Sequence, residues 1–81
     1  MISCEKFDYI EMACMFNYTV ELKLVTGHSI SGIATDTVTG SEQEQLVLTD
    51  DSGTRKNVPL DQVRQLNVLS NNARFSSVSF E

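Results

Sequence analysis

The chain has 81 residues, which is enough for one hydrophobic core and too few for a large enzyme with separate substrate and cofactor lobes. Its 41% hydrophobic and 21% charged residues are typical of a folded globular protein and exclude a disordered tail. Six Lys and Arg residues against eleven Asp and Glu residues give a formal net charge of −5, which opposes nucleic-acid binding and favours a basic partner surface. We therefore expect a single domain over residues 1–81 with no direct nucleic-acid contact.

The sequence carries no sign of a membrane or secretory segment. Its uninterrupted apolar runs are only a few residues long, far below the roughly 20 that cross a bilayer. The amino end also lacks the basic stretch followed by an apolar stretch that marks a signal peptide. These features predict a cytoplasmic protein without membrane contact.

Cys4 and Cys14 are the two cysteines of the chain. The segment between them reads as a helix, which separates them by roughly 15 Å along its axis, whereas a disulfide needs Cα atoms within about 7 Å. We therefore expect two reduced thiols. Together with His28, the single histidine, they lack the ligand spacing of a structural zinc site, so we expect no metal.

Residues 3–16 predict an amphipathic helix with Ser3 as its N-cap. Apolar residues recur there at spacings of three and four and form one stripe that we expect to pack on the core. The residues assigned to this stripe are Phe7, Ile10, Ala13 and Cys14.

The opposite side of this helix carries Glu5, Asp8, Tyr9 and Met12, with Glu11 at the border between the two sides. Asp8 and Glu11 lie three residues apart and are neighbours on the helix surface, where they can meet one Arg or two adjacent Lys side chains. The alternative is a solvated acidic face without a partner, because exposed acids on helices are common.

The rest of the chain reads as β-structure, since 19 Val, Ile and Thr residues stand against 3 Ala. Apolar and polar residues alternate in short segments separated by turn signals, as in half-buried strands. We expect strands over residues 20–24, 29–35, 45–50, 54–60, 63–70 and 74–80, with the fourth ending in a tight turn at 60–62. This pattern is typical of a small barrel or sandwich preceded by one helix.

Three positions add detail to the predicted strands. Gly32 indicates a bend or a close approach of two backbones. Pro59 cannot donate a hydrogen bond to a neighbouring strand and therefore belongs at a strand end or a sheet edge. Residues 37–45 are polar and contain no basic residue, and we expect them to form a surface loop.

Catalysis finds no support in the sequence. His28 has Ser29 and Ser31 beside it, but no G-x-S-x-G turn or third orienting group accompanies them. A glycine-rich phosphate loop is also missing. We expect no enzyme activity, no catalytic residues, no cofactor and no small-molecule substrate.

The amino-terminal run Ile2–Cys14 resembles the opening of the Rho-binding antiterminator family (Rof/YaeO), with the pattern I-x-C-x-x-(F/Y)-D-x-(I/L)-E-x-A-C. Gly27 with Ala34 and Asp36 is similar to the strand–turn–strand segment of that family, and Leu60–Val63 is similar to its late L-D-x-I step. The resemblance covers roughly residues 1–66.

The resemblance implies a mainly β fold, with a small Sm-like, partly open antiparallel barrel of five or six strands over residues 18–80 behind the helix of residues 3–16. It also implies a non-enzymatic inhibitor of Rho-dependent transcription termination, that is, an antitermination protein. Members bind the primary RNA-binding site in the amino-terminal domain of Rho and block RNA loading. The net charge agrees with this partner, because an RNA-binding site is basic.

On this resemblance, Asp8 and Glu11 are the leading candidates for Rho binding, and Glu5 is a further one. Tyr9 and Met12 lie beside them and are candidates for an apolar contact with Rho. The alternative for Tyr9 and Met12 is partial burial against a strand edge.

One segment departs from the family. Its members carry basic residues in the loop between the second and third strands that contribute to the Rho contact, and this chain has Gly40, Ser41 and Glu42 there. We therefore transfer only the helix positions.

The alternative function is an Sm-like or OB-like module that binds single-stranded RNA. Such barrels use basic grooves and stacking aromatic residues. This chain has six aromatic residues and no Trp, and Arg55 and Lys56 are its only adjacent basic pair. The composition therefore favours the protein-directed function.

Overall fold

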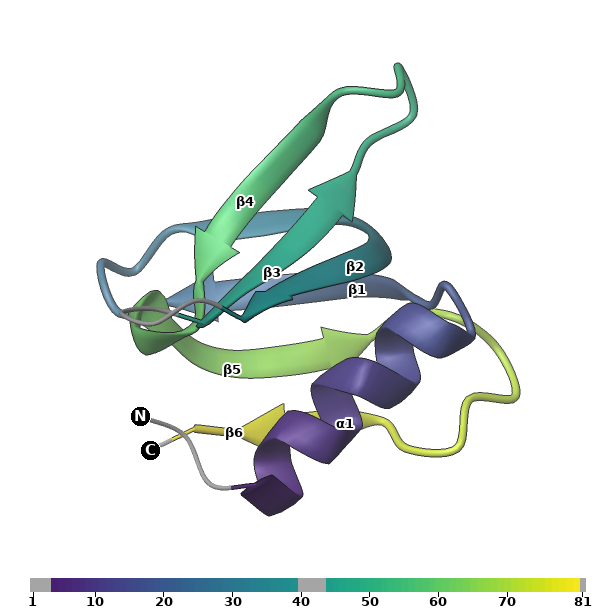
Figure 1. Ribbon diagram of the computed structural model, residues 1–81, viewed down its shortest axis with the longest axis horizontal. Helices are drawn as coiled ribbons and strands as arrows, with labels where there is room; N and C mark the ends of the chain where they lie inside the picture. The colour runs from purple at the N-terminus through teal and green to yellow at the C-terminus, as the bar shows by residue number, and fades with distance from the viewer. Residues whose placement is uncertain (1–3, 40–43, 81) are drawn as a thin grey trace.

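One helix and a six-stranded antiparallel sheet make up the fold, seen in a computed structural model that describes residues 4–39 and 44–80 (Figure 1). Helix α1 spans Cys4–Met15, and the strands are β1 (Thr19–Leu24), β2 (Ser29–Thr39), β3 (Glu44–Thr49), β4 (Arg55–Pro59), β5 (Val63–Val68) and β6 (Ser77–Ser79). The strand order is β4-β3-β2-β1-β5-β6. The sheet is not closed, which confirms the mainly β, partly open antiparallel fold.

Helix α1 is held by the apolar stripe that the sequence predicts. The side chains of Ile10 and Ala13 are fully buried, and those of Phe7 and Cys14 are partly buried against the same core. A 12-residue helix is marginal in isolation, whereas burial of one Ile side chain contributes about 1.5–3 kcal/mol. The helix therefore depends on its packing against the sheet, mainly on β2. The predicted N-cap, Ser3, lies outside the described residues.

Asn17 ends the helix and ties it to the sheet. It adopts a left-handed conformation with φ of 50°, which Asn tolerates better than most residues. Its side-chain Nδ2 donates hydrogen bonds to the carbonyl oxygens of Cys14, at 3.2 Å, and Ala34, at 3.0 Å. The backbone N–H of Ala34 donates in turn to the carbonyl of Tyr18 at 2.9 Å. The chain thus leaves α1 already bonded to β2.

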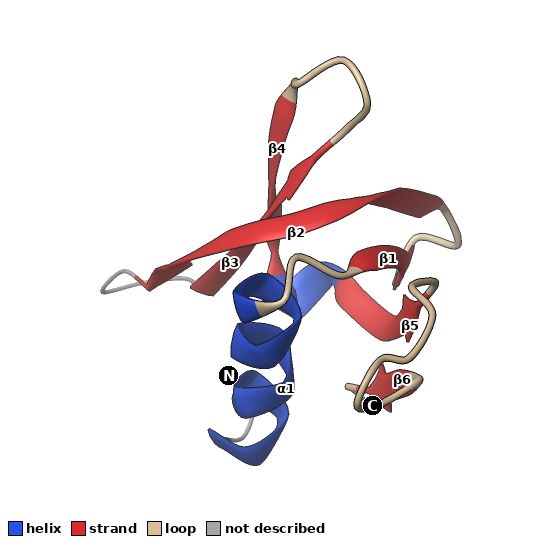
Figure 2. Cartoon of the chain, turned by 90° about the vertical axis from the view of Figure 1, so that its right-hand side faces the viewer, coloured by secondary structure: helices blue, strands red, loops and turns tan. Residues whose placement is uncertain are grey.

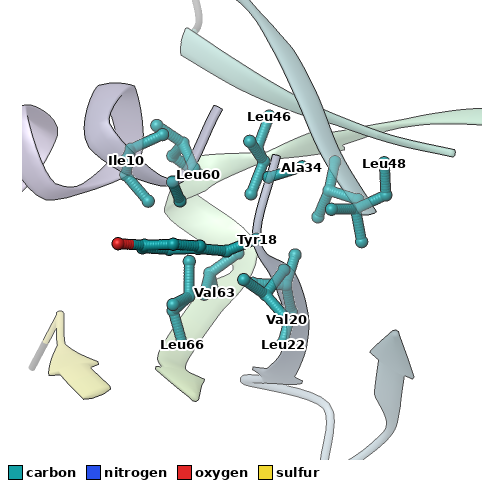
Figure 3. Close-up of a cluster of buried hydrophobic side chains, with 12 residues drawn as sticks. Ile10, Tyr18, Val20, Leu22, Ala34, Leu46, Leu48, Leu60, Val63 and Leu66 are labelled. Carbon is teal, nitrogen blue, oxygen red and sulfur yellow. The ribbon is translucent and has the colours of Figure 1, made fainter. Parts of the chain in front are cut away.

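The core lies between α1 and the sheet (Figure 3). Alternate residues of β1 and of β3 enter it, as the period of two predicts. Its buried members are Ile10, Ala13, Tyr18, Val20, Leu22, Ala34, Leu46, Leu48, Val58, Leu60, Val63 and Leu66.

Strand β2 crosses the sheet with a β-bulge. Ala34 pairs with Leu48 and Asp36 pairs with Val47, so Thr35 is the extra residue. The Thr35 hydroxyl donates to the Val47 carbonyl at 3.2 Å. Because one inserted residue reverses the alternation of faces, Asp36 faces away from the core side on which Ala34 lies.

Gly32 marks a close approach, as predicted. A Cβ atom at this position would lie 3.1 Å from the Thr49 carbonyl oxygen and 3.3 Å from the Leu48 Cβ. The absence of a side chain therefore allows β2 and β3 to approach at this point.

The prediction of one surface loop over residues 37–45 is wrong at both ends. Strand β2 continues to Thr39 and β3 begins at Glu44, and these two residues pair with each other. Strand pairing uses backbone groups, so polar residues extend a hairpin where no apolar alternation marks it. Gly40, Ser41 and Glu42 lie outside the described residues.

The remaining elements agree with the sequence except at the carboxyl end. Pro59 ends the edge strand β4, and residues 60–62 form a single 3-10 turn. The last strand, β6, covers 77–79 rather than 74–80. The turn between β3 and β4 projects away from α1 (Figure 2).

Candidate functional site

The solvent side of α1 presents a continuous stripe of two acidic and two thioether side chains. This stripe begins at Asp8 and continues with Glu11, Met12 and Met15. These follow Asp8 by three, four and seven residues, which places all four on one face of the helix. Asp8 and Glu11 are exposed, Met12 is half-buried and Met15 is 75% exposed. We call these four residues the acidic helix face. Met15 was not predicted, although its spacing of seven residues from Asp8 was a usable signal.

The two carboxylates of this face are available to a partner. Within residues 4–39 and 44–80, neither Asp8 nor Glu11 makes a hydrogen bond or an ion pair. Water hydrates an exposed carboxylate until a cationic side chain displaces it. Arg can do so with two parallel hydrogen bonds, which form a strong ion pair. The face therefore offers two adjacent anionic groups on a helix that the core already anchors.

Asp36 of β2 is a third carboxylate, whose charge acts on the Cys14 thiol of this helix. Burial raises the pKa of the Cys14 thiol to about 11, and the nearby carboxylates of Asp36 and Glu11 act in the same direction. Each carboxylate therefore lies close enough to Cys14 for its negative charge to raise the pKa of the thiol. The sequence did not predict Asp36 as a site residue, because the bulge that turns it outward left no pattern in the residues.

The other predicted site residues have different surroundings. Tyr9 is half-buried, and its ring edge packs on Phe75 with a centroid distance of 5.1 Å. This is partial burial, against the segment between β5 and β6 rather than against a strand. The backbone of Glu5 belongs to α1, but its side chain lies outside the described part of the structure.

Cys14 is a free thiol, and the side chain of Cys4 lies outside the described residues. In the described part of the chain, no group of three or more His, Cys, Asp or Glu side chains could hold a metal ion. None of the described helices has the length and apolarity needed to cross a membrane.

Comparisons with known proteins identify the family of this chain. Residues 1–80 match the ROF family, described as modulator of Rho-dependent transcription termination. Among solved structures, the chain is similar to YaeO from Vibrio cholerae O395, solved bound to magnesium. The identity is 33% and the TM-score 0.80, and the match covers 91% of this chain and 96% of that one. A comparison with curated proteins finds no significant match. With a family match over nearly its whole length and a shared fold, this chain belongs to the ROF family of modulators of Rho-dependent transcription termination, a family of regulators rather than enzymes.

Proposed function

We propose that this protein inhibits Rho-dependent termination by binding the primary RNA-binding site in the amino-terminal domain of Rho and blocking RNA loading. The acidic helix face makes the contact, with the carboxylates of Asp8 and Glu11 in the place of RNA phosphates. Glu5, in the first turn of α1, is a further candidate for this contact, and Met12 adds an apolar contact. The mechanism has no catalytic step and acts in the cytoplasm, where Rho meets RNA.

One observation carries the proposal: the carboxylates of Asp8 and Glu11 are exposed and have no internal partner among the described residues. A site that binds RNA must present positive charge to phosphates. An acidic protein with a net charge of −5 is attracted to such a surface over a distance, and unpaired carboxylates can form charge-assisted hydrogen bonds on arrival.

The same structure argues against RNA binding by this chain. Tyr9 and Tyr18 pack on Phe75 and none of these three rings is exposed, so within the group only Phe16, which is 44% exposed, offers a ring to a base. Stacking on exposed aromatic rings is the main sequence-tolerant contact that single-strand binders use. RNA binding by this protein is therefore the alternative function that the experiment below must exclude.

The test is a competition between this protein and a cytosine-rich RNA for purified Rho. RNA affinity is measured by fluorescence anisotropy at several concentrations of the protein. We expect the apparent dissociation constant for RNA to rise in proportion to the protein concentration, while nucleotide binding by Rho stays unchanged. A gel shift of the same RNA with this protein alone, at low salt, is the control.

Two results would contradict the proposal. A ternary complex in which Rho keeps its full RNA affinity would exclude occlusion of the primary site and indicate an allosteric inhibitor. Tight binding of RNA by the isolated protein would instead favour the Sm-like or OB-like RNA-binding function.

A further inference from the structure

A chain of aromatic contacts joins the flank of α1 to the segment that follows β5. The ring of Phe75 lies between two tyrosines, 5.1 Å from Tyr9 and 5.9 Å from Tyr18, and both contacts are edge-to-face with interplanar angles of 61° and 62°. Tyr18 also stacks on Phe16, with ring centroids 5.6 Å apart. We call Tyr9, Phe16, Tyr18 and Phe75 the aromatic clamp.

Arg74 closes the clamp beside Phe75. Its guanidinium lies over the Phe16 ring, 5.0 Å from the centroid. Its backbone N–H donates a hydrogen bond of 3.0 Å to the Tyr18 hydroxyl. The two residues Arg74 and Phe75 therefore hold α1 near its middle, through Tyr9, and just beyond its end, through Phe16.

The clamp supplies a restraint that the core packing of α1 lacks. Ile10 and Ala13, with Phe7 and Cys14 partly buried beside them, form one stripe of contact that sets the distance of the helix from the sheet. A helix held through one stripe can still rotate by a small angle about its own axis. Tyr9 contacts Phe75 from the flank of the helix, one residue after Asp8, so this second line of contact opposes rolling. The direction in which Asp8 points then depends on the clamp.

We propose that Phe75 and Arg74 are positioning residues for Rho binding, which orient the acidic helix face through the aromatic clamp. On this account Tyr9 acts by packing on Phe75 and does not itself contact Rho. The inference rests on the proposed function, because it assumes that the acidic helix face binds Rho. A partner that needs one helix orientation binds more weakly in proportion to the fraction of molecules that lose it.

The first test replaces Phe75 with Ala and uses Phe80→Ala as the matched control. Phe80 is also partly buried against the core near the carboxyl end, but it makes no ring contact within the described structure. We expect Phe75→Ala to weaken Rho binding by about two- to tenfold, the range that the loss of aromatic pairs supports. Phe80→Ala should leave the affinity for Rho unchanged at a temperature where both variants are folded.

Near-ultraviolet circular dichroism gives a second readout that is specific to the clamp. The chain has two Tyr residues and no Trp, and both tyrosines, Tyr9 and Tyr18, belong to the clamp. The tyrosine band therefore reports on these four rings. It should collapse in Phe75→Ala and persist in Phe80→Ala, while the far-ultraviolet spectrum of both variants stays that of the parent.

Two further substitutions protect the test against misfolding. Phe75→Tyr keeps the ring edge and should restore the parent affinity for Rho. Phe75→Leu keeps apolar volume without a ring, so it should fold even if Phe75→Ala does not, and should still bind Rho more weakly than the parent. A Tyr9→Ala, Phe75→Ala double variant should lose no more affinity than Phe75→Ala alone, because Phe75→Ala already removes the contact with Tyr9.

Asp8→Lys separates failure of this inference from failure of the proposed function. If Asp8→Lys weakens Rho binding while Phe75→Leu binds like the parent, the clamp does not position the helix, although the acidic helix face still binds Rho. Equal losses in Phe75→Ala and Phe80→Ala would show a general loss of stability and would also overturn the inference. If neither Asp8→Lys nor Phe75→Leu affects binding, both proposals are wrong.

Discussion

Asp8 and Glu11 are the residues at which the proposed Rho contact can be tested most directly. Replacing either with Lys turns attraction to a basic site into repulsion at an exposed position, so the fold should be unaffected. We expect Asp8→Lys or Glu11→Lys to weaken Rho binding about tenfold or more at low salt, since close charge pairs across an interface couple by about 1.5 kcal/mol or more. Isothermal titration with purified Rho measures the effect.

Asp51→Lys is the matched control for this charge reversal. Asp51 is equally exposed but lies in the turn between β3 and β4, which projects away from α1. It changes the net charge by the same amount, so any effect of long-range attraction alone appears in all three variants. If the two α1 variants bind Rho no more weakly than Asp51→Lys, the acidic helix face is not the contact.

Cys14 should make the stability of the protein depend on alkaline pH. Burial, with the Asp36 and Glu11 carboxylates in addition, raises the pKa of its thiol from 9.0 to about 11 in the folded state. The unfolded chain therefore loses this proton first, and the contribution to stability is complete below pH 9.0 and is lost as pH rises through about 11.

The measurement is urea unfolding of the parent and of Cys14→Ser, which has no thiol to titrate. We expect the parent to lose more stability than Cys14→Ser between about pH 8 and about pH 10. Parallel losses in the two proteins would mean that Cys14 is less buried than its surroundings indicate.

At the scale of elements, Asn17 decides how α1 ends and how it joins β2. Asn17→Ala removes two side-chain hydrogen bonds and places at φ of 50° a residue that tolerates the left-handed region less well than Asn. We expect a loss of about 2 kcal/mol in the free energy of unfolding, roughly half from the left-handed conformation and half from the hydrogen bonds. Asn17→Gly adopts this conformation freely, so it should lose only about 1 kcal/mol.

Urea unfolding of the two variants separates these contributions. Equal stability of Asn17→Ala and Asn17→Gly would show that the left-handed conformation costs nothing here. Parent-like stability of Asn17→Gly would show that the bonds to Cys14 and Ala34 do not stabilise the junction.

The elements differ in how well the sequence predicts them, for a physical reason. The residues that form the apolar stripe of α1 lie within a few positions of one another, and so do those that alternate in β1. Each pattern is therefore visible in a short stretch of sequence. The pairing of Thr39 with Glu44 uses backbone hydrogen bonds between polar residues on an exposed hairpin. Such pairing leaves no hydrophobic pattern, and the two strands therefore run further than predicted.

For the whole molecule, the proposed contact predicts how the complex with Rho responds to salt. Exposed carboxylates on a basic site are screened over a Debye length of about 8 Å at physiological ionic strength, so rising salt should weaken the complex. The dependence should be shallower than that of RNA, because RNA binding also releases counterions condensed on its own backbone.

Two titrations of one Rho preparation across the same salt series, one with RNA and one with this protein, provide the comparison. A complex whose affinity does not change with salt would contradict an electrostatic contact. A dependence as steep as that of RNA would contradict the expected shallower slope.

The sequence alone determines the fold class, the helix with its buried stripe, the family and the position of Asp8 and Glu11 on the exposed side of that helix, because these follow from residue types at short, regular spacings. Three features of the candidate site depend on the tertiary structure. The bulge at Thr35 turns Asp36 outward, Met15 stays uncovered, and Tyr9 packs on Phe75. Each depends on how segments that are far apart in the sequence are arranged in the folded protein. Local residue patterns do not contain that information.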